Sequence, residues 1–216
     1  YGGYYTKKEI KEIVKYASER YIEVIPEIEL RGHSQDAIAS YTYLSCKDEI
    51  INVSTSWGVF KDIYCAGNDS VFTFLENIFQ EITEIFPSDR IHIGGDEAPK
   101  FRWENCEKCQ KRVKDEGLKN EHELQNYFIQ RVARILERKN KKIIGWDEIN
   151  ESSIKGDVTI QSWRGFMGGI KAVKEGKKVI MSPTSHCYFD YEIKSIDLEK
   201  VYSFNPIPKG LNCLLY

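Results

Sequence analysis

The sequence predicts a single α/β domain of the barrel type, in which helices alternate with short parallel strands. Segments with helical and strand patterns follow one another in the order α-β-α-β-α-β-β-α-β. The strand segments are short apolar runs with little polar alternation, which is typical of parallel strands buried on both faces. A doubly wound open sheet is the competing fold, but it usually carries a glycine-rich phosphate loop after its first strand, and the sequence has none there.

The first half of the chain contains a helix, a strand, a long loop and a second helix. The residues from Thr6 to Glu9 form a capping box that opens the first helix. A strand over 21–27 follows, and a polar and aromatic loop of about forty residues comes after it. The second helix begins at a cap, Asp69 or Ser70, and ends at a proline. Its predicted buried side chains are Phe74, Ile78, Ile82 and Ile85.

The second half of the chain holds the remaining strands. A strand over 90–94 ends in two glycines, and two adjacent carboxylates follow at once, Asp96 and Glu97. A capping box at 120–123 opens a long helix. The apolar positions of that helix are Leu124, Phe128, Val132 and Ile135. The last predicted elements are, in order, strands over 143–146 and 158–163 that each end in tryptophan, a helix over 170–175, and a strand over 179–182.

Composition argues against two kinds of partner. The 216 residues include 31 basic and 33 acidic side chains, so the formal net charge is −2. A charge this small gives no field that would attract nucleic acid or an anionic membrane. The longest apolar runs are also far too short to span a bilayer. We therefore expect neither a nucleic-acid partner nor a membrane span.

The six cysteines are only partly informative. Cys106 and Cys109 form a C-x-x-C motif at a predicted helix start, but a zinc site needs four ligands and no second pair has matching spacing. We therefore expect no metal. A redox pair would need a thioredoxin-like context, which is also missing. Cys46 and Cys65 flank a long stretch of loop and could form a disulfide in an exported protein, a pairing that the sequence leaves open.

Chemically active side chains follow the predicted strands at their C-terminal ends, where the catalytic groups of barrel enzymes lie. Each has a more ordinary interpretation on its own: a tryptophan in the core, a histidine bonded to its own loop, a turn with two solvated acids. Together they suit a carbohydrate, because aromatic rings stack on the apolar faces of sugars and carboxylates accept hydrogen bonds from hydroxyls. The residues at these strand ends are Glu27, His33, Asp96, Glu97, Trp146, Asp147, Glu148, Trp163, Arg164, Tyr188 and Asp190.

The adjacency of Asp96 and Glu97 restricts the mechanism. Ordinary glycosidases hold two carboxyl groups across the scissile bond, ~5–5.5 Å apart when retaining and ~6.5–9.5 Å apart when inverting, usually from different strands. Adjacent residues tend to point to different sides of the chain, so this pair is unsuited to that arrangement. Different tasks fit better: one acid protonates the leaving oxygen, and the other orients a nucleophile that the substrate supplies.

Seven short motifs, in order along the chain, together resemble those of a known enzyme family. They are Gly3 to Thr6, Val24 to Glu29 with Gly32 and His33, His92 to Glu97, Gly145 to Glu148, Ser162 to Gly165, Tyr188 to Tyr191, and Tyr202 to Pro206. The sequence resembles the β-N-acetylhexosaminidases of glycoside hydrolase family 20. The His-Ile-Gly-Gly-Asp-Glu run is the most specific of these motifs, and the match spans essentially the whole chain.

The resemblance implies a (β/α)8 barrel of the TIM type and an enzyme that removes terminal N-acetylglucosamine or N-acetylgalactosamine from the non-reducing ends of glycans. In that family the substrate's own 2-acetamido oxygen attacks the anomeric carbon, with net retention and no cofactor. The roles that the resemblance implies are general acid/base for Glu97, acetamido orientation for Asp96, an acetamido hydrogen bond for Tyr188, pocket walls for Trp146 and Trp163, a sugar-hydroxyl contact for Asp190, and support of Glu97 for His33.

The resemblance also implies that residues 1–216 form a single, partial catalytic domain. They correspond roughly to strands 3 to 7 of the eight, so the first two strands and the last are expected to be missing. A barrel without three strands has open edges, and the isolated segment is not expected to be a competent enzyme. A secreted, periplasmic or lysosomal location and a homodimer are compatible with the family, but the sequence itself establishes neither.

Two other hypotheses follow from the same residues. One is a non-catalytic carbohydrate-binding protein, or an inactive fragment, of the same fold; the retained acid pair argues against it, because a binding module needs no proton donor. The other is a metal-dependent barrel hydrolase that uses His33, His92, Asp96 and Glu97, although His92 lies inside its predicted strand.

Overall fold

The centre of the structure, a computed structural model, is a sheet of four parallel strands in the order β1-β2-β3-β4. The structure describes residues 3–30, 32–47, 49–56, 58–151, 154–192, 194–208 and 211. The strands are β1 (Arg90–His92), β2 (Lys142–Trp146), β3 (Val158–Ser162) and β4 (Lys178–Met181). Each pairs in parallel with the next along the chain, which confirms these four of the predicted strands and their direction.

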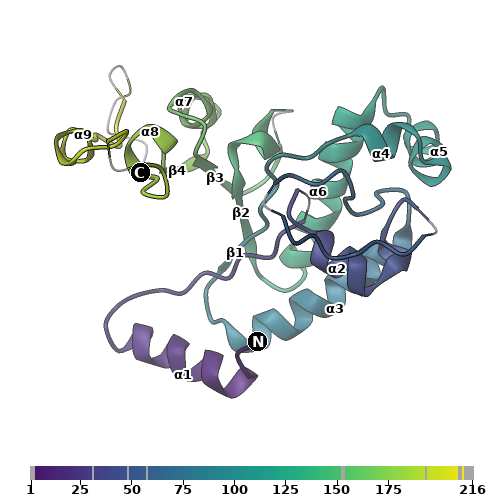
Figure 1. The fold of residues 1–216 in the computed structure, drawn as a ribbon, viewed down its shortest axis with the longest axis horizontal. Coiled ribbons are helices and arrows are strands. Elements are labelled where there is room, and N and C mark those ends of the chain that lie inside the picture. Colours follow the sequence, from purple (N-terminus) through teal and green to yellow (C-terminus); the bar gives the residue numbers. More distant parts are fainter. Residues whose placement is uncertain are drawn as a thin grey trace.

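Helices cover the sheet and bury its apolar side chains. Helix α6 (Glu121–Glu137) packs against β2 and against α3 (Asp69–Ile85), while α7 (Met167–Lys174) packs against β3 and β4. Helix α1 (Lys7–Ser18) lies beside α3, at the edge of the molecule (Figure 1). The smaller elements are α2 (Gln35–Ser40), η1 (Thr42–Leu44), α4 (Phe101–Glu104), α5 (Glu107–Asp115), η2 (Asp147–Asn150), α8 (Thr184–Cys187) and α9 (Leu198–Tyr202).

The predicted helix caps are largely confirmed. Thr6 and Glu9 form a reciprocal capping box at the start of α1. At the start of α6 the Asn120 side chain accepts hydrogen bonds from two backbone N–H groups, while the Glu123 carboxylate accepts from the N–H of Lys119 rather than from that of Asn120. The apolar positions predicted for α6 are all buried. None of the helices in the described part of the chain is long and apolar enough to cross a membrane.

The prediction for the second helix was wrong in its cap and in its buried face. Asn68 caps α3, and Asp69 is already its first residue. Ile85 is buried as predicted, but Phe74, Ile78 and Ile82 are only partly buried. The helix carries two apolar rows, and the row that packs against α6 lies elsewhere, with the ring centroids of Phe72 and Phe128 5.0 Å apart. The buried row is Val71, Phe72, Leu75 and Phe79.

The strand predicted over 21–27 is reduced to a single parallel bridge between Glu27 and His92. His92 donates its backbone N–H to the Pro26 carbonyl at 2.9 Å, and Ile28 donates to the His92 carbonyl at 2.9 Å. The start of the predicted strand is not extended, because Tyr21 has φ 58°, and both Tyr21 and Ile22 are exposed. Glu27 is nevertheless held beside β1, as the prediction required.

The turn after β1 positions the acid pair, and it depends on glycine. Gly94 and Gly95 both have positive φ, 60° and 99°, a region that L side chains rarely adopt. The N–H of Gly95 donates to Glu29 Oε1 at 3.2 Å. A Cβ at Gly94 would overlap the Glu29 carboxylate. The backbone at Gly94 is therefore closely approached, and the group that approaches it is a side chain of the chain itself.

We predict that Gly94→Ala destabilises the full-length protein by about 2–4 kcal/mol, because it adds a steric clash to the cost of a positive φ. The matched control is Gly117→Ala: Gly117 has φ 63°, close to the value at Gly94, and nothing lies within 4 Å of its added Cβ. This control should lose only about 1 kcal/mol. Denaturant unfolding of both variants gives the comparison, and equal losses would show that the Glu29 contact is unimportant.

Candidate active site

The described strands deliver most of the candidate residues to one edge of the sheet. Asp96 and Glu97 follow β1, Trp146 ends β2 and Trp163 follows β3. Because the strands are parallel, their carboxyl ends meet at the same edge, which is the catalytic edge of a barrel.

The acid pair lies against His33. His33 Nε2 is 3.6 Å from Asp96 Oδ2 and 3.6 Å from Glu97 Oε2. The segment that carries His33 lies on the backbone of the pair, since a Cβ at Gly32 would be 2.8 Å from the Glu97 carbonyl oxygen. The resemblance implied support of Glu97 by His33, and in the structure the imidazole is equally close to both acids.

The two acids have different environments. Asp96 is mostly buried, and burial raises the pKa of its carboxyl, with the nearby charges of Glu97 and Glu27 adding to the effect. Its Oδ1 is buried and accepts no hydrogen bond from any residue that the structure describes. Glu97 is more exposed and has φ 46°, an uncommon conformation for a residue other than glycine. Such strain occurs most often at functional sites.

A cavity of about 310 Å³ opens beside Glu97 and contains a second buried acid. Burial raises the pKa of Glu148 to about 7. The Trp163 indole N–H lies 3.1 Å and 3.0 Å from the two carboxylate oxygens of Glu148. The residues that line the cavity are Glu97, Ala98, Lys100, Gln125, Glu148, Glu151, Trp163 and Arg164.

Asp147 holds the start of the next segment in place. It is buried, and it accepts the backbone N–H of Trp163 at 3.3 Å and the Arg164 Nε–H at 3.0 Å. The sequence placed Asp147, Glu148 and Arg164 at strand ends but assigned them no role, because burial and the indole contact cannot be read from a Trp-Asp-Glu pattern. The structure adds all three to the site.

Two aromatic groups flank the acids. The rings of Trp163 and Tyr188 stack with centroids 6.3 Å apart and an interplanar angle of 27°. Burial raises the pKa of Tyr188 to about 12, and the charges of Asp96 and Asp190 contribute, so the phenol keeps its proton. Asp190 is itself exposed.

Trp146 and His92 belong to a third group, centred on Glu27. Trp146 donates its indole N–H to Glu27 Oε1 at 3.1 Å, and His92 Nδ1 lies 3.0 Å from the same oxygen. The two rings meet edge to face at 4.9 Å. The metal hypothesis needed His92 beside the acid pair. Ligand atoms of His33, Asp96 and Glu97 do lie within 4.8 Å of one another, but His92 faces Glu27 instead.

Comparison with known families gives a match along nearly the entire chain. Residues 1–212 match the model described as glycosyl hydrolase family 20, catalytic domain. A β-hexosaminidase of Porphyromonas gingivalis is 45% identical over 223 residues, covering 98% of this chain and 29% of that protein. A β-hexosaminidase of Akkermansia muciniphila is 33% identical over 94% of this chain and 44% of that protein.

Solved structures with the same fold include enzymes of this kind. The Flavobacterium johnsoniae chitobiase matches with a TM-score of 0.87 and 32% identity, over 97% of this chain and 32% of that chain. An exo-β-N-acetylglucosaminidase of Vibrio harveyi, solved in complex with N-acetylglucosamine, matches with a TM-score of 0.86 and 26% identity, over 97% and 36%. The chain thus spans less than half the length of each relative. The likeness confirms the predicted fold class, a segment of a (β/α)8 barrel.

The raised pKa of Glu148 predicts a pH dependence of stability. The folded protein keeps a proton on this carboxyl that the unfolded chain releases near the ordinary glutamate pKa of 4.5, so stability falls as pH rises from 4.5 to about 7. Glu148→Gln lacks this titration and keeps an acceptor oxygen for the Trp163 indole. We expect the Tm of the variant minus the Tm of the wild type to rise by a few degrees across this pH interval. At higher pH this difference should stay constant.

The matched control for this prediction is Glu151→Gln, which removes an exposed carboxylate that lines the same cavity and pairs with Arg164 at 3.1 Å. Its Tm difference from the wild type should stay nearly constant between pH 5 and about 8. Thermal unfolding at a series of pH values provides the measurement. A Glu148→Gln difference as flat as that of the control would contradict a buried, protonated Glu148.

Proposed function

Because the chain belongs to glycosyl hydrolase family 20, whose catalytic-domain model matches residues 1–212, we propose that the full-length protein removes terminal N-acetylhexosamine residues from the non-reducing ends of glycans. The proposal includes retention of configuration, with the substrate's 2-acetamido group as the nucleophile. One observation supports this mechanism above all: two adjacent acids, both 3.6 Å from His33, have unlike environments suited to unlike tasks.

Asp96 is the residue proposed to orient the acetamido group. Its buried Oδ1 has no hydrogen-bond donor among the described residues, and a buried acceptor without a donor is costly. The acetamido N–H is a donor of the right kind to satisfy this oxygen. Accepting that bond turns the acetamido carbonyl oxygen toward the anomeric carbon, and the carboxylate then stabilises the positive charge that develops as this oxygen bonds to the carbon.

Glu97 is the proposed general acid and base. It stands at the rim of the cavity, more exposed than Asp96, where a leaving group and a water molecule can reach it. Its proton passes to the glycosidic oxygen as the bond to the anomeric carbon breaks. In the second step Glu97 takes a proton from the water that opens the cyclic intermediate, so the carboxyl returns to its first state. His33 positions both carboxylates.

The aromatic residues are proposed to enclose the sugar ring. The stacked rings of Trp163 and Tyr188 offer an apolar wall, and the Tyr188 phenol, which keeps its proton, can donate a hydrogen bond to the acetamido oxygen. Trp146 is fixed by its bond to Glu27 and is proposed as a second wall. Asp190 is exposed and is proposed to accept a hydrogen bond from a sugar hydroxyl.

Substrate assistance predicts a strong preference for the acetamido sugar. The full-length protein should hydrolyse an aryl N-acetyl-β-glucosaminide more than about 10³-fold faster than the aryl β-glucoside, because only the first carries the internal nucleophile. Release of the aryl alcohol gives both values of kcat/KM. Equal rates on the two substrates would contradict the mechanism, and calorimetric binding of N-acetylglucosamine without any turnover would favour a binding protein instead.

Substitutions should separate the two acids. Glu97→Gln should lower kcat by about 10²–10⁴-fold on a substrate with a poor leaving group and much less on one with an activated leaving group, which needs no proton. Asp96→Asn should lower kcat by about 10²–10³-fold on both, because the developing charge is no longer stabilised. Glu104→Gln, on the exposed surface of α4, is the control and should keep wild-type rates. An unchanged rate in Asp96→Asn would contradict its proposed role.

A further inference from the structure

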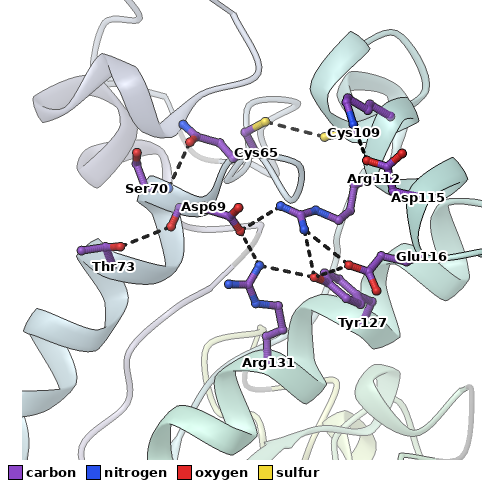
Figure 2. Close-up of polar contacts among 12 residues, drawn as sticks. Cys65, Asp69, Ser70, Thr73, Cys109, Arg112, Asp115, Glu116, Tyr127 and Arg131 are labelled. Carbon is purple, nitrogen blue, oxygen red and sulfur yellow. Dashed lines mark hydrogen bonds and ion pairs between the residues drawn. The ribbon is translucent and has the colours of Figure 1, made fainter.

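Four cysteines from distant parts of the chain meet in one cluster outside the candidate active site. Cys46 and Cys65 come from the long segment after Glu27, and Cys106 and Cys109 stand at the start of α5. All four sulfur atoms lie within 4.8 Å of one another. Cys65, Cys106 and Cys109 are buried, and Cys46 is partly buried. Figure 2 shows Cys65 pointing at Cys109 across the gap between two helices.

The distances between the sulfur atoms are those of a metal tetrahedron. They are 3.8 Å for Cys46 and Cys109, 3.8 Å for Cys65 and Cys106, and 3.7 Å for Cys65 and Cys109. A zinc–sulfur bond of about 2.3 Å gives a tetrahedron whose edges are ~3.8 Å long. Two sulfur atoms in a disulfide lie ~2.05 Å apart, and each has a single partner. Here Cys65 and Cys109 are each nearly equidistant from two other sulfurs.

We propose that Cys46, Cys65, Cys106 and Cys109 bind a structural zinc ion. Four thiolates fill all four positions of a tetrahedral zinc, so the site is closed and has no open position for a substrate or water. Tetrahedral coordination by four sulfurs is typical of zinc or of iron. The ion ties the long segment to α4 and α5 and takes no part in hydrolysis.

The local backbone brings the ligands together. Cys106 precedes the first residue of α5 and Cys109 lies in its first turn, where the unpaired N–H groups of a helix favour negative charge.

The other two ligands lie on the arms of a short antiparallel bridge. Ser45 pairs with Tyr64, so Cys46 and Cys65 each follow a paired residue, and the Cys65 N–H donates to the Leu44 carbonyl at 2.8 Å. This hairpin can approach α5 closely because a Cβ at Gly67 would overlap the Lys108 carbonyl, which lies between the two cysteines of the C-x-x-C motif.

Further contacts hold the same parts of the chain together, so the proposed ion lies where these segments already pack against each other. The Trp103 indole N–H donates to the Tyr64 carbonyl at 2.9 Å, and Arg102 Nε donates to Asp62 at 2.7 Å. On the other side, Arg112 reaches Asp69 at 2.8 Å (Figure 2). The first two bonds join the end of the long segment to α4, and the third joins the start of α3 to α5.

The sequence predicted no metal because the C-x-x-C motif had no second pair with matching spacing. The fold supplies the second half of the site from Cys46 and Cys65, which a hairpin brings together. The disulfide between Cys46 and Cys65 that the sequence left open does not form in the structure, where both are free thiols.

The first test is metal analysis of the full-length protein, purified without a metal-affinity step and dialysed against metal-free buffer. We expect inductively coupled plasma mass spectrometry to find one zinc ion per chain. After removal by a chelator under denaturing conditions, refolding with Co²⁺ should give the visible absorption of tetrahedral cobalt thiolate. Refolding with Zn²⁺ should restore the Tm, and refolding without metal should leave it lower by roughly 5–10 °C.

Variants separate a metal ligand from a buried thiol that only packs. Cys46→Ser should lose the zinc and the thermal stability that goes with it. Cys46→His should keep the zinc, because the position is only partly buried and Cys₃His is also a structural zinc set. Cys187→Ser removes a thiol outside the cluster and is the matched control, which should keep the metal.

Several results would overturn the proposal. One is a protein that contains no zinc as purified and neither binds Co²⁺ nor gains stability from Zn²⁺ on refolding. Another is iron in place of zinc. A third is disulfide bonds among the four cysteines, found by alkylation and mass spectrometry before reduction. Equal zinc content in Cys46→Ser and the wild type would exclude Cys46 as a ligand.

Discussion

The close approach of three backbone segments at the end of β1 is the constraint on which the candidate site depends. Gly94 lies against the Glu29 carboxylate, and its carbonyl accepts the N–H of Trp146 at 3.0 Å. A Cβ at Gly145 would lie 3.1 Å from the same carbonyl oxygen. The turn is therefore held between the segment before β1 and the end of β2. This packing fixes the direction in which Asp96 and Glu97 leave the sheet.

The same edge of the sheet holds two pairs of acids, and burial separates their properties. Asp96 and Glu97 share His33 and remain accessible from the cavity. Asp147 and Glu148 are buried, and their oxygens accept bonds from Trp163 and Arg164. A protonated Glu148 adds no charge beside Glu97, whereas an ionised one would oppose ionisation of the first pair. The buried pair thus anchors the indole wall through its hydrogen bonds to Trp163.

Sequence patterns predicted what depends on local periodicity, and they missed what depends on tertiary contacts. The parallel strands and the acids at their ends followed from short apolar runs and from the rule that strand ends meet at one edge. The buried face of α3 did not, because two apolar rows compete and only the position of α6 selects between them. The environment of Glu148 and the approach of Cys65 to Cys106 and Cys109 are likewise invisible in sequence, since residues far apart in the chain create them.

The segment between Glu27 and α3 links the cysteine cluster to the candidate active site. Among its described residues it contains little regular structure beyond α2 and η1, so few backbone ladders offset the ordering cost of about 1–2 kcal/mol per residue. It is held instead at both ends: Gly32 and His33 pack on the acid pair, and Cys46 and Cys65 meet the start of α5. A zinc ion at the second point would restrict the motion of the whole segment. It would thereby keep His33 positioned beside Asp96 and Glu97 without contacting either acid.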